Sequence, residues 1–400
     1  MFTGKPANLP IWSEAVPPPG WPDNVVGDVF IRQRLLMSRG FLRYSRFVMT
    51  TLSGLSGMEP RPRPTMRDVA ALAGVSLKTV SRVVNREPGV SGDLQGRVRR
   101  AAQQLDFRLN LTASNLRRAD QRTATIGLLV EDVGNPFFAA IHRGVEDIAG
   151  PLDVGVFSAS LEEDQDRERR LIQAFAARRV DGIILSPTGA EHGYLLSEMR
   201  AGLPMVFVDR APRGVEGDLV LTNNREHARA ATRHLLASGH RHIGFLGGTL
   251  ALQTAEERYR GFVDAMLEAD APILPSLVAR DLRSVHQAEA ATELLLAGDP
   301  RPTAFFTAQN LLSTGAIRAL HAHQLQHDIA LVGFDDVEFA DVLSPAVSVI
   351  AQDPRRLGQV AAELLFARIA DPDLEPQVSF VNSQLVQRGS GEIPVRSGSR

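Results

Sequence analysis

From Thr125 onward, short apolar runs alternate with stretches whose apolar residues have helical spacing. The pattern predicts strands at 125–130, 154–158, 182–185 and 205–208, with helices at 137–149, 164–178 and 191–201. After a short link the alternation resumes near residue 241, with strands in "HIGFLGG", "TAFFTA" and "IALVGF" and helices in "TAEERYRGFVDAML" and "LLSTGAIRALHAH". Strands that alternate with helices form parallel sheets. We therefore predict an α/β core at residues 123–400, built from two similar doubly wound lobes.

Two facing lobes of this kind have a natural ligand site. Parallel sheets bind ligands outside the carboxyl ends of their strands. If the two lobes lie side by side, those ends surround one shared cleft, which is a common place for a small-molecule site.

A different pattern precedes the core, because residues 65–105 read as three short helices. Thr65 with Asp68 three residues later resembles a capping box, and Gly74 suits the left-handed position after a helix. Ser76 and Ser91 are placed to cap the second and third helices. A helix, a glycine corner and a second short helix are typical of a helix-turn-helix unit.

The second helix carries the candidate base-reading face. Leu77, Lys78, Ser81 and Arg82 share one side of it. In a helix-turn-helix this face enters the major groove of DNA, where Arg82 could donate to the O6 and N7 atoms of a guanine. The alternative is a solvated basic face on an ordinary helix.

Charge supports the DNA-binding interpretation. Residues 58–122 hold 13 Lys and Arg against 6 Asp and Glu, whereas residues 123–400 hold 25 against 37. A basic segment joined to an acidic body is typical of a tethered nucleic-acid reader. Residues 1–57 sustain no helical or strand period, and we expect an extension produced by an upstream start codon, or else a disordered basic arm.

The segment "NLTASNLRR" at 110–118 has two interpretations. It is either a flexible linker or a helix that becomes ordered only on DNA. In the second case Leu116 would be an apolar wedge in the minor groove, with Arg117 and Arg118 near phosphates.

Six stretches together resemble the lactose-repressor (LacI/GalR) family of bacterial transcription regulators. They are "MRDVAALAGVSLKTVSRVVN", "NLTASNL", "TIGLLVEDVGNPFFAAIHRGVED", "SGHRHIGFLGG", "ERYRGF" and "VGFDDVEFADVLSPAVSVIAQDPRRLG". The resemblance covers residues 66 to about 390. It implies a helix-turn-helix headpiece at 58–108, a hinge helix or linker at 109–122 and a periplasmic-binding-protein-like core at 123–400. It also implies a homodimer or tetramer that binds a palindromic operator under the control of a sugar-like effector.

The resemblance further implies which residues bind. It places Leu77, Lys78 and Arg82 on bases, Leu116 at the operator centre, and Arg258 and Asp335 on the effector. The candidate DNA-binding residues are Thr65, Ser76, Leu77, Lys78, Thr79, Ser81, Arg82, Asn85, Ser91, Asn110, Ala113, Leu116 and Arg117. The candidate effector-binding residues are Asn135, Phe137, Phe138, Ser186, Arg258, Leu282, Gln309, Asn310 and Asp335.

Without the resemblance, a surface salt bridge to Glu256 or Glu257 would explain Arg258, and a helix N-cap would explain Asp335. The chain also departs from the family pattern. Gln309 and Asn310 replace an Asn-Asp pair, Leu282 stands near where some members place an aromatic residue, and Leu109 replaces a proline.

Other functions fit the sequence less well. An exported sugar-binding protein would share the core but would have no use for residues 66–118, and it needs an export signal that residues 1–57 do not supply. Hydrolase and phosphate-loop motifs are absent, and His240 and His242 read as the entry to a strand rather than as a metal pair. The chain has no cysteine and no uncharged run of 18 apolar residues. We therefore expect a cytoplasmic regulator that is not an enzyme, needs no cofactor and does not bind a membrane.

Overall fold

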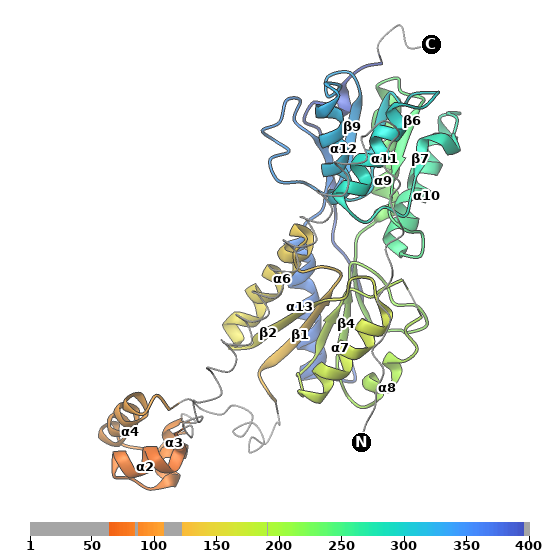
Figure 1. The fold of residues 1–400 in the computed structure, drawn as a ribbon. Helices are drawn as coiled ribbons and strands as arrows, with labels where there is room; N and C mark the ends of the chain where they lie inside the picture. Colours follow the sequence, from red (N-terminus) through yellow and green to blue (C-terminus); the bar gives the residue numbers. More distant parts are fainter. Residues whose placement is uncertain (1–63, 85–86, 108–121, 190, 396–400) are drawn as a thin grey trace, which may run out of the picture. The chain divides into compact units, whose positions relative to one another are not determined.

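The computed structural model describes residues 64–84, 87–107, 122–189 and 191–395. The chain forms two compact units, Met1–Leu109 and Asn110–Arg400. The described part of the first unit is called the headpiece here. Figure 1 shows both units, and each is described below by itself.

The headpiece consists of the three predicted helices. They are α2 (Met66–Ala73), α3 (Leu77–Val84) and α4 (Gly92–Gln104). Asp68 Oδ2 accepts hydrogen bonds of 2.7 Å from both the backbone N–H and the hydroxyl of Thr65, which confirms the predicted cap. Gly74 has a φ of +61° and ends α2 as expected. The three helices enclose a small apolar core built from Val69, Ala70, Ala73, Val80, Val98 and Ala101.

One contact in the headpiece was not predicted. Arg97 on α4 donates from Nη2 to the carbonyl oxygens of Ala73 and Gly74, at 2.7 and 3.1 Å. The last carbonyls of a helix lack partners within the helix. Arg97 therefore closes the end of α2 and fixes the corner that precedes the reading helix.

The second unit contains two lobes, and each is a six-stranded sheet covered by helices on both faces. Lobe 1 has the strand order β11-β5-β4-β3-β1-β2, and all neighbours are parallel. Its strands are β1 (Thr125–Val130), β2 (Gly155–Ser160), β3 (Ile183–Leu185), β4 (Met205–Val208), β5 (Asp218–Leu221) and β11 (Val378–Phe380). Its helices are α6 (Pro136–Ala149), α7 (Gln165–Ala177), α8 (Leu195–Arg200) and α13 (Pro354–Ala370).

Lobe 2 repeats this plan with the order β12-β10-β9-β8-β6-β7. Its strands are β6 (Ile243–Leu246), β7 (Val278–Ala279), β8 (Ala304–Thr307), β9 (Ala330–Phe334), β10 (Ser348–Ala351) and β12 (Gln384–Val386). Its helices are α9 (Asn224–Ala237), α10 (Gln253–Glu268), α11 (Val285–Leu296) and α12 (Asn310–Ala322). The prediction of parallel sheets is wrong for the last strand, because β12 runs antiparallel to β10.

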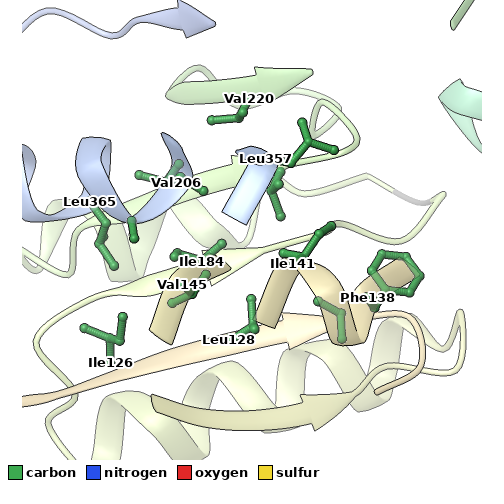
Figure 2. Packing of buried hydrophobic residues seen from close by; sticks show 14 of the residues in the cluster. Ile126, Leu128, Phe138, Ile141, Val145, Ile184, Val206, Val220, Leu357 and Leu365 are labelled. Carbon is green, nitrogen blue, oxygen red and sulfur yellow. The ribbon is translucent and has the colours of Figure 1, made fainter. Parts of the chain in front are cut away.

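Strands buried on both faces explain the continuous apolar runs in the sequence. In lobe 1, Leu128, Ile184 and Val206 from neighbouring strands pack against α6 and α13 on one face, as Figure 2 shows. The opposite face packs against α7 and α8. In lobe 2, α9 and α10 cover one face, and α11 and α12 cover the other.

One expectation about the chain path is wrong. The stretch 209–240 is not a short link, because it holds strand β5 and helix α9. Neither lobe is one consecutive stretch of the chain, which the sequence did not indicate. After lobe 2 is built, α13 and β11 return to lobe 1, where α13 lies beside α6 (Figure 1). The chain therefore crosses between the lobes three times, at 221–224, 351–354 and 380–384.

Two glycines allow α6 and α13 to approach closely. A Cβ atom built on Gly144 would lie 2.0 Å from the carbonyl oxygen of Arg355, and one built on Gly358 would lie 2.0 Å from that of Ile141. The two backbones thus touch where the helices cross. None of the helices in the described part of the chain, α6 and α13 included, is long and apolar enough to span a bilayer.

Candidate DNA-reading helix and effector cleft

Helix α3 presents the side chains predicted to read bases. Leu77 and Lys78 are exposed, whereas Thr79, Ser81 and Arg82 are half-buried. Ser76 caps the helix as predicted, because its hydroxyl oxygen accepts from the backbone N–H of Thr79 at 3.1 Å. A basic, capped helix with one exposed face is the arrangement that enters a major groove.

The remaining candidate DNA-binding residues lie outside α3. Thr65 and Ser91 precede α2 and α4 and are exposed, but the Ser91 side chain makes no capping hydrogen bond. Asn85, Asn110, Ala113, Leu116 and Arg117 lie outside the described residues. The roles of all these residues on DNA therefore stay predictions.

Arg82 already has partners in the headpiece. Its Nη2 atom donates to the carbonyl oxygen of Pro88 at 2.6 Å, and its Nε atom lies 3.6 Å from a carboxylate oxygen of Glu87. To reach a guanine, the guanidinium must exchange these contacts for base acceptors.

Arg82→Ala is expected to relax the base preference at one position of each half-site and to cost about 1–3 kcal/mol there, because a two-pronged donor to a base is lost. Arg117→Ala is expected to weaken binding to all sequences alike, as loss of a phosphate contact does. Binding-site selection with the parent and both variants separates the two effects. An unchanged motif for Arg82→Ala would remove Arg82 from the base-reading residues.

One cavity of the core is lined by both lobes and holds most of the candidate effector residues. Eight of the nine candidate effector residues lie on it; Ser186 does not, although it is buried at the end of β3 in lobe 1. Lobe 1 contributes Glu131, Asn135, Phe137, Phe138, Glu163, Asp209 and Arg210. Lobe 2 contributes Gly248, Thr249, Leu252, Thr254, Ala255, Arg258, Leu282, Arg283, Ala308, Gln309, Asn310 and Asp335. These cavity residues are called the effector cleft below.

On the lobe 2 side, Arg258 and Asp335 form a buried ion pair. Nη1 of Arg258 lies 3.7 Å from Oδ2 of Asp335, and both residues are 6% exposed. Arg258 also donates to Asn224 Oδ1 and to the Ala308 carbonyl oxygen, each at 2.8 Å, and its guanidinium lies over the Phe334 ring. These contacts fix the guanidinium in the cleft.

The structural explanations for this pair do not hold. Arg258 is buried, and Glu256 and Glu257 bond instead to Arg260 and Gln253. Asp335 caps no helix, because the described chain from 336 to 347 contains none. Burial raises the pKa of Asp335 although Arg258 opposes the shift, and Gln352 donates to its carboxylate at 2.5 Å.

Lobe 1 contains a matching pair that the sequence interpretation missed. Asp209 follows β4 as Asp335 follows β9, both have a φ of +69°, and each N–H bonds to the next strand of its sheet. The signal was present, since "FVD" at 207–209 repeats the strand-to-acid pattern of "GFD" at 333–335. Burial raises the pKa of Asp209 to about 6, against the effect of Arg210 and Arg258.

Arg210 stands at the centre of a carboxylate cluster. It bonds to Glu131 at 2.8 Å and to Glu163, and Asp209 lies 3.4 Å away. Burial alone would lower the pKa of Arg210, but the three acids raise it overall. This cluster gives lobe 1 a surface of fixed donors and acceptors in which three acids surround one arginine.

Two amides connect the lobes across the cleft. Asn310 Nδ2 donates to Asn135 Oδ1 at 2.7 Å, and Asn135 Nδ2 donates back at 3.4 Å. Asn135 also caps α6, because its oxygen accepts from the backbone N–H of Phe137. Asn310 is the first residue of α12 rather than its cap. Phe137 and Phe138 meet edge to face, with centroids 5.2 Å apart, and supply an aromatic wall beside these amides.

Family models match both units of the chain. The model for bacterial regulatory proteins of the lacI family matches residues 65–110, and the periplasmic binding protein-like domain matches residues 232–391. The HTH-type transcriptional repressor PurR of Aliivibrio fischeri (strain ATCC 700601 / ES114) is 33% identical over 331 residues, which cover 82% of this chain and 98% of that protein. The ribose operon repressor of Escherichia coli (strain K12) is 32% identical over 329 residues, covering 82% and 99%.

Solved structures of similar proteins point to the same family. The lac repressor dimer bound to operator and the anti-inducer ONPF superposes with a TM-score of 0.71 at 25% identity, covering 82% of this chain and 99% of that one. The complex of the transcriptional regulator CelR with cellobiose gives a TM-score of 0.60 at 31% identity, covering 82% and 100%. This chain therefore belongs to the LacI family, and it is a DNA-binding transcriptional repressor, not an enzyme, that a small-molecule effector controls.

Proposed function

We propose that the chain acts as a homodimer on a palindromic operator, and that its effector is a sugar bound in the effector cleft. The observation that carries this proposal is the pair of Asp-Arg groups, Asp209 with Arg210 and Arg258 with Asp335, on opposite lobes of one cavity.

A sugar suits these groups because each hydroxyl both donates and accepts a hydrogen bond. Arginine only donates and a carboxylate only accepts, so an Asp-Arg pair can hold neighbouring hydroxyls at once. Asn135 and Asn310 add amides that do both. The rings of Phe137 and Phe138 offer an apolar surface to the C–H face of a sugar.

The relatives are consistent with this class of ligand. One is named a ribose operon repressor, and a structural neighbour is described as a complex with cellobiose. Leu282 supplies only aliphatic contact at its position on the cleft. We infer that recognition here depends on the polar groups and on the two phenylalanines more than on stacking from lobe 2.

The cleft explains how a ligand could control DNA binding. A ligand shifts a conformational equilibrium only if it binds one state better than the other. A sugar held by both lobes favours the arrangement in which they lie close together, and the three crossing segments are the places where the lobes can pivot. Through residues 109–122, that arrangement would either promote or oppose operator binding.

Thermal unfolding of the full chain with a panel of sugars, polyols and nucleobases tests the proposal. A ligand at a hundred times its dissociation constant is expected to stabilise the protein by about 2.7 kcal/mol. The same compound should change operator affinity in a fluorescence-anisotropy titration on a site obtained by selection. If only nucleobases stabilise the protein, the sugar assignment is wrong, although the repressor assignment stands.

A further inference from the structure

One arginine of the effector cleft is unlike the others. Arg210 and Arg258 contact carboxylates, as described above. Arg283 also lines the cavity but is exposed, and among the described residues its side chain has no hydrogen bond and no ion pair. Only its backbone N–H is engaged, and it donates to Gln287 Oε1 at 2.7 Å. A cation beside a ligand cavity without an acid next to it is available for an anion.

The cavity wall next to lobe 2 also includes the start of a long helix. Helix α10 has sixteen residues, and Thr254 and Ala255 of its first turn line the cleft. Its N-cap is Leu252, which has no side-chain acceptor, so the backbone N–H groups of the first turn are not capped. Such a helix end carries a partial positive charge and attracts anions.

Thr254 gives a second, independent indication. It is only 6% exposed and lines the cavity, but its hydroxyl has no hydrogen-bond partner among the described residues. Its Oγ1 atom keeps some exposure, so it is open to a ligand in the cavity and can donate to it. The Thr254 hydroxyl, the first-turn amides of α10 and the Arg283 guanidinium are therefore hydrogen-bond donors without acceptors. A ligand in the cavity can supply those acceptors.

We propose that this end of the cleft, formed by Arg283, Thr254 and the first turn of α10, binds an anionic oxygen group of the effector, either a phosphate ester or a carboxylate. The inference rests on the proposed sugar-binding function and narrows it to sugar phosphates or sugar acids. Each of the three elements can donate hydrogen bonds to oxygen, and guanidinium in particular matches the geometry of both groups.

Charge fixes the orientation of such a ligand. The lobe 1 side holds Glu131, Glu163 and Asp209 around a single arginine, so a second anion there would meet repulsion. The lobe 2 side offers Arg283 and the end of α10. The anionic group therefore belongs against lobe 2, and the uncharged hydroxyls extend toward Asp209, Arg210 and the Asn135–Asn310 pair.

Calorimetric titration of the full chain tests this inference. The probes are D-ribose and D-glucose, their 5- and 6-phosphates, and the corresponding aldonates. At least one phosphate or aldonate is expected to bind about tenfold or more tightly than its neutral parent sugar, because charge-assisted hydrogen bonds are the stronger ones. The phosphate and aldonate arms show which anion the site takes.

Substitutions test whether these residues cause the preference for anionic over neutral sugars. Arg283→Gln and Thr254→Val should each reduce the ratio of anionic to neutral affinity, because each removes a donor to the anionic group. Arg280→Gln is the matched control, because Arg280 lies three residues away over the Tyr259 ring and is not part of the cavity wall. It should keep the full ratio.

Two results would overturn the inference. Neutral sugars that bind as well as or better than every anionic partner would remove the anion subsite and leave the proposed function intact. An Arg283→Gln variant that keeps the full ratio would remove Arg283 from it. If no sugar of either kind binds, the proposed function itself fails, and the anion subsite fails with it.

Discussion

Asp335→Ala is expected to abolish the effector's influence on operator binding. The variant removes a carboxylate acceptor from the cleft, and a hydrogen bond to a charged group contributes about 1.5–3 kcal/mol, which is roughly 10-fold to 150-fold in ligand affinity. Arg258→Ala should have the same effect. If the effector releases DNA, both variants should still hold the operator in its presence; if the effector promotes binding, both should fail to hold the operator. Calorimetry with the effector and anisotropy with the operator measure the two properties separately.

The neighbouring acid provides the control. Asp336 bonds to Arg388 at 2.6 Å, is exposed and does not line the cleft, so Asp336→Ala should keep the effector response.

A second variant separates the effect on stability from the effect on ligand binding. Removal of Asp335 leaves Arg258 buried without its acid, which lowers the stability of the protein. Asp335→Asn keeps the volume of the side chain and should lose the response while remaining folded. Wild-type ligand affinity in both Asp335 variants would exclude Asp335 from the effector site.

Gly144→Val is expected to have the largest effect on stability. Its Cβ would meet the carbonyl oxygen of Arg355 at 2.0 Å, and backbone cannot rotate away as a side chain can. Overpacking costs about 1–3 kcal/mol and more where backbone must shift. A loss of about 3 kcal/mol lowers the Tm of a unit of about 290 residues by roughly 5 °C, since the entropy of unfolding is about 2.1 cal/mol/K per residue.

A second glycine, directly after the same helix, serves as the control. A Cβ on Gly150, which follows α6 with a φ of −57°, would meet nothing within 4 Å. Gly150→Ala should therefore leave the Tm nearly unchanged. Equal melting temperatures for Gly144→Val and the parent would mean that α6 and α13 do not cross as closely as the structure has them.

Local features of the fold were predictable because they depend on neighbouring residues. The caps at Thr65 and Ser76 and the turn at Gly74 follow from side-chain chemistry over three or four positions. Helix α9 was missed because its sequence, "NREHARAATRHLLA", carries its apolar face mainly on alanines. The return of α13 to lobe 1 depends on contacts between residues more than 200 positions apart, such as Arg355 with Asp147 at 2.6 Å, and no local pattern encodes them.

Some residues of the candidate site could be identified from the sequence, and others only from the structure. Arg258 and Asp335 were identified through the family resemblance, since their own surroundings in the sequence suggested a surface ion pair and a helix cap. Asp209 and Arg210 were not identified, although they directly follow a predicted strand. Arg283 has no motif around it, and its availability becomes visible only when the partners of every other charged group in the cleft are known. Such an inventory needs coordinates.

The position of α13 has a consequence for how the protein is made. A ribosome completes the headpiece, which has its own buried core, before it has made any of the strands. Lobe 1, by contrast, begins at β1 but lacks Leu357, Ala361 and Leu365 until nearly the whole chain has been synthesised. Until then the sheet face that holds Ile184 and Val206 is only partly covered. A nascent or prematurely terminated chain would thus carry a finished DNA-reading unit on an unfinished, aggregation-prone body.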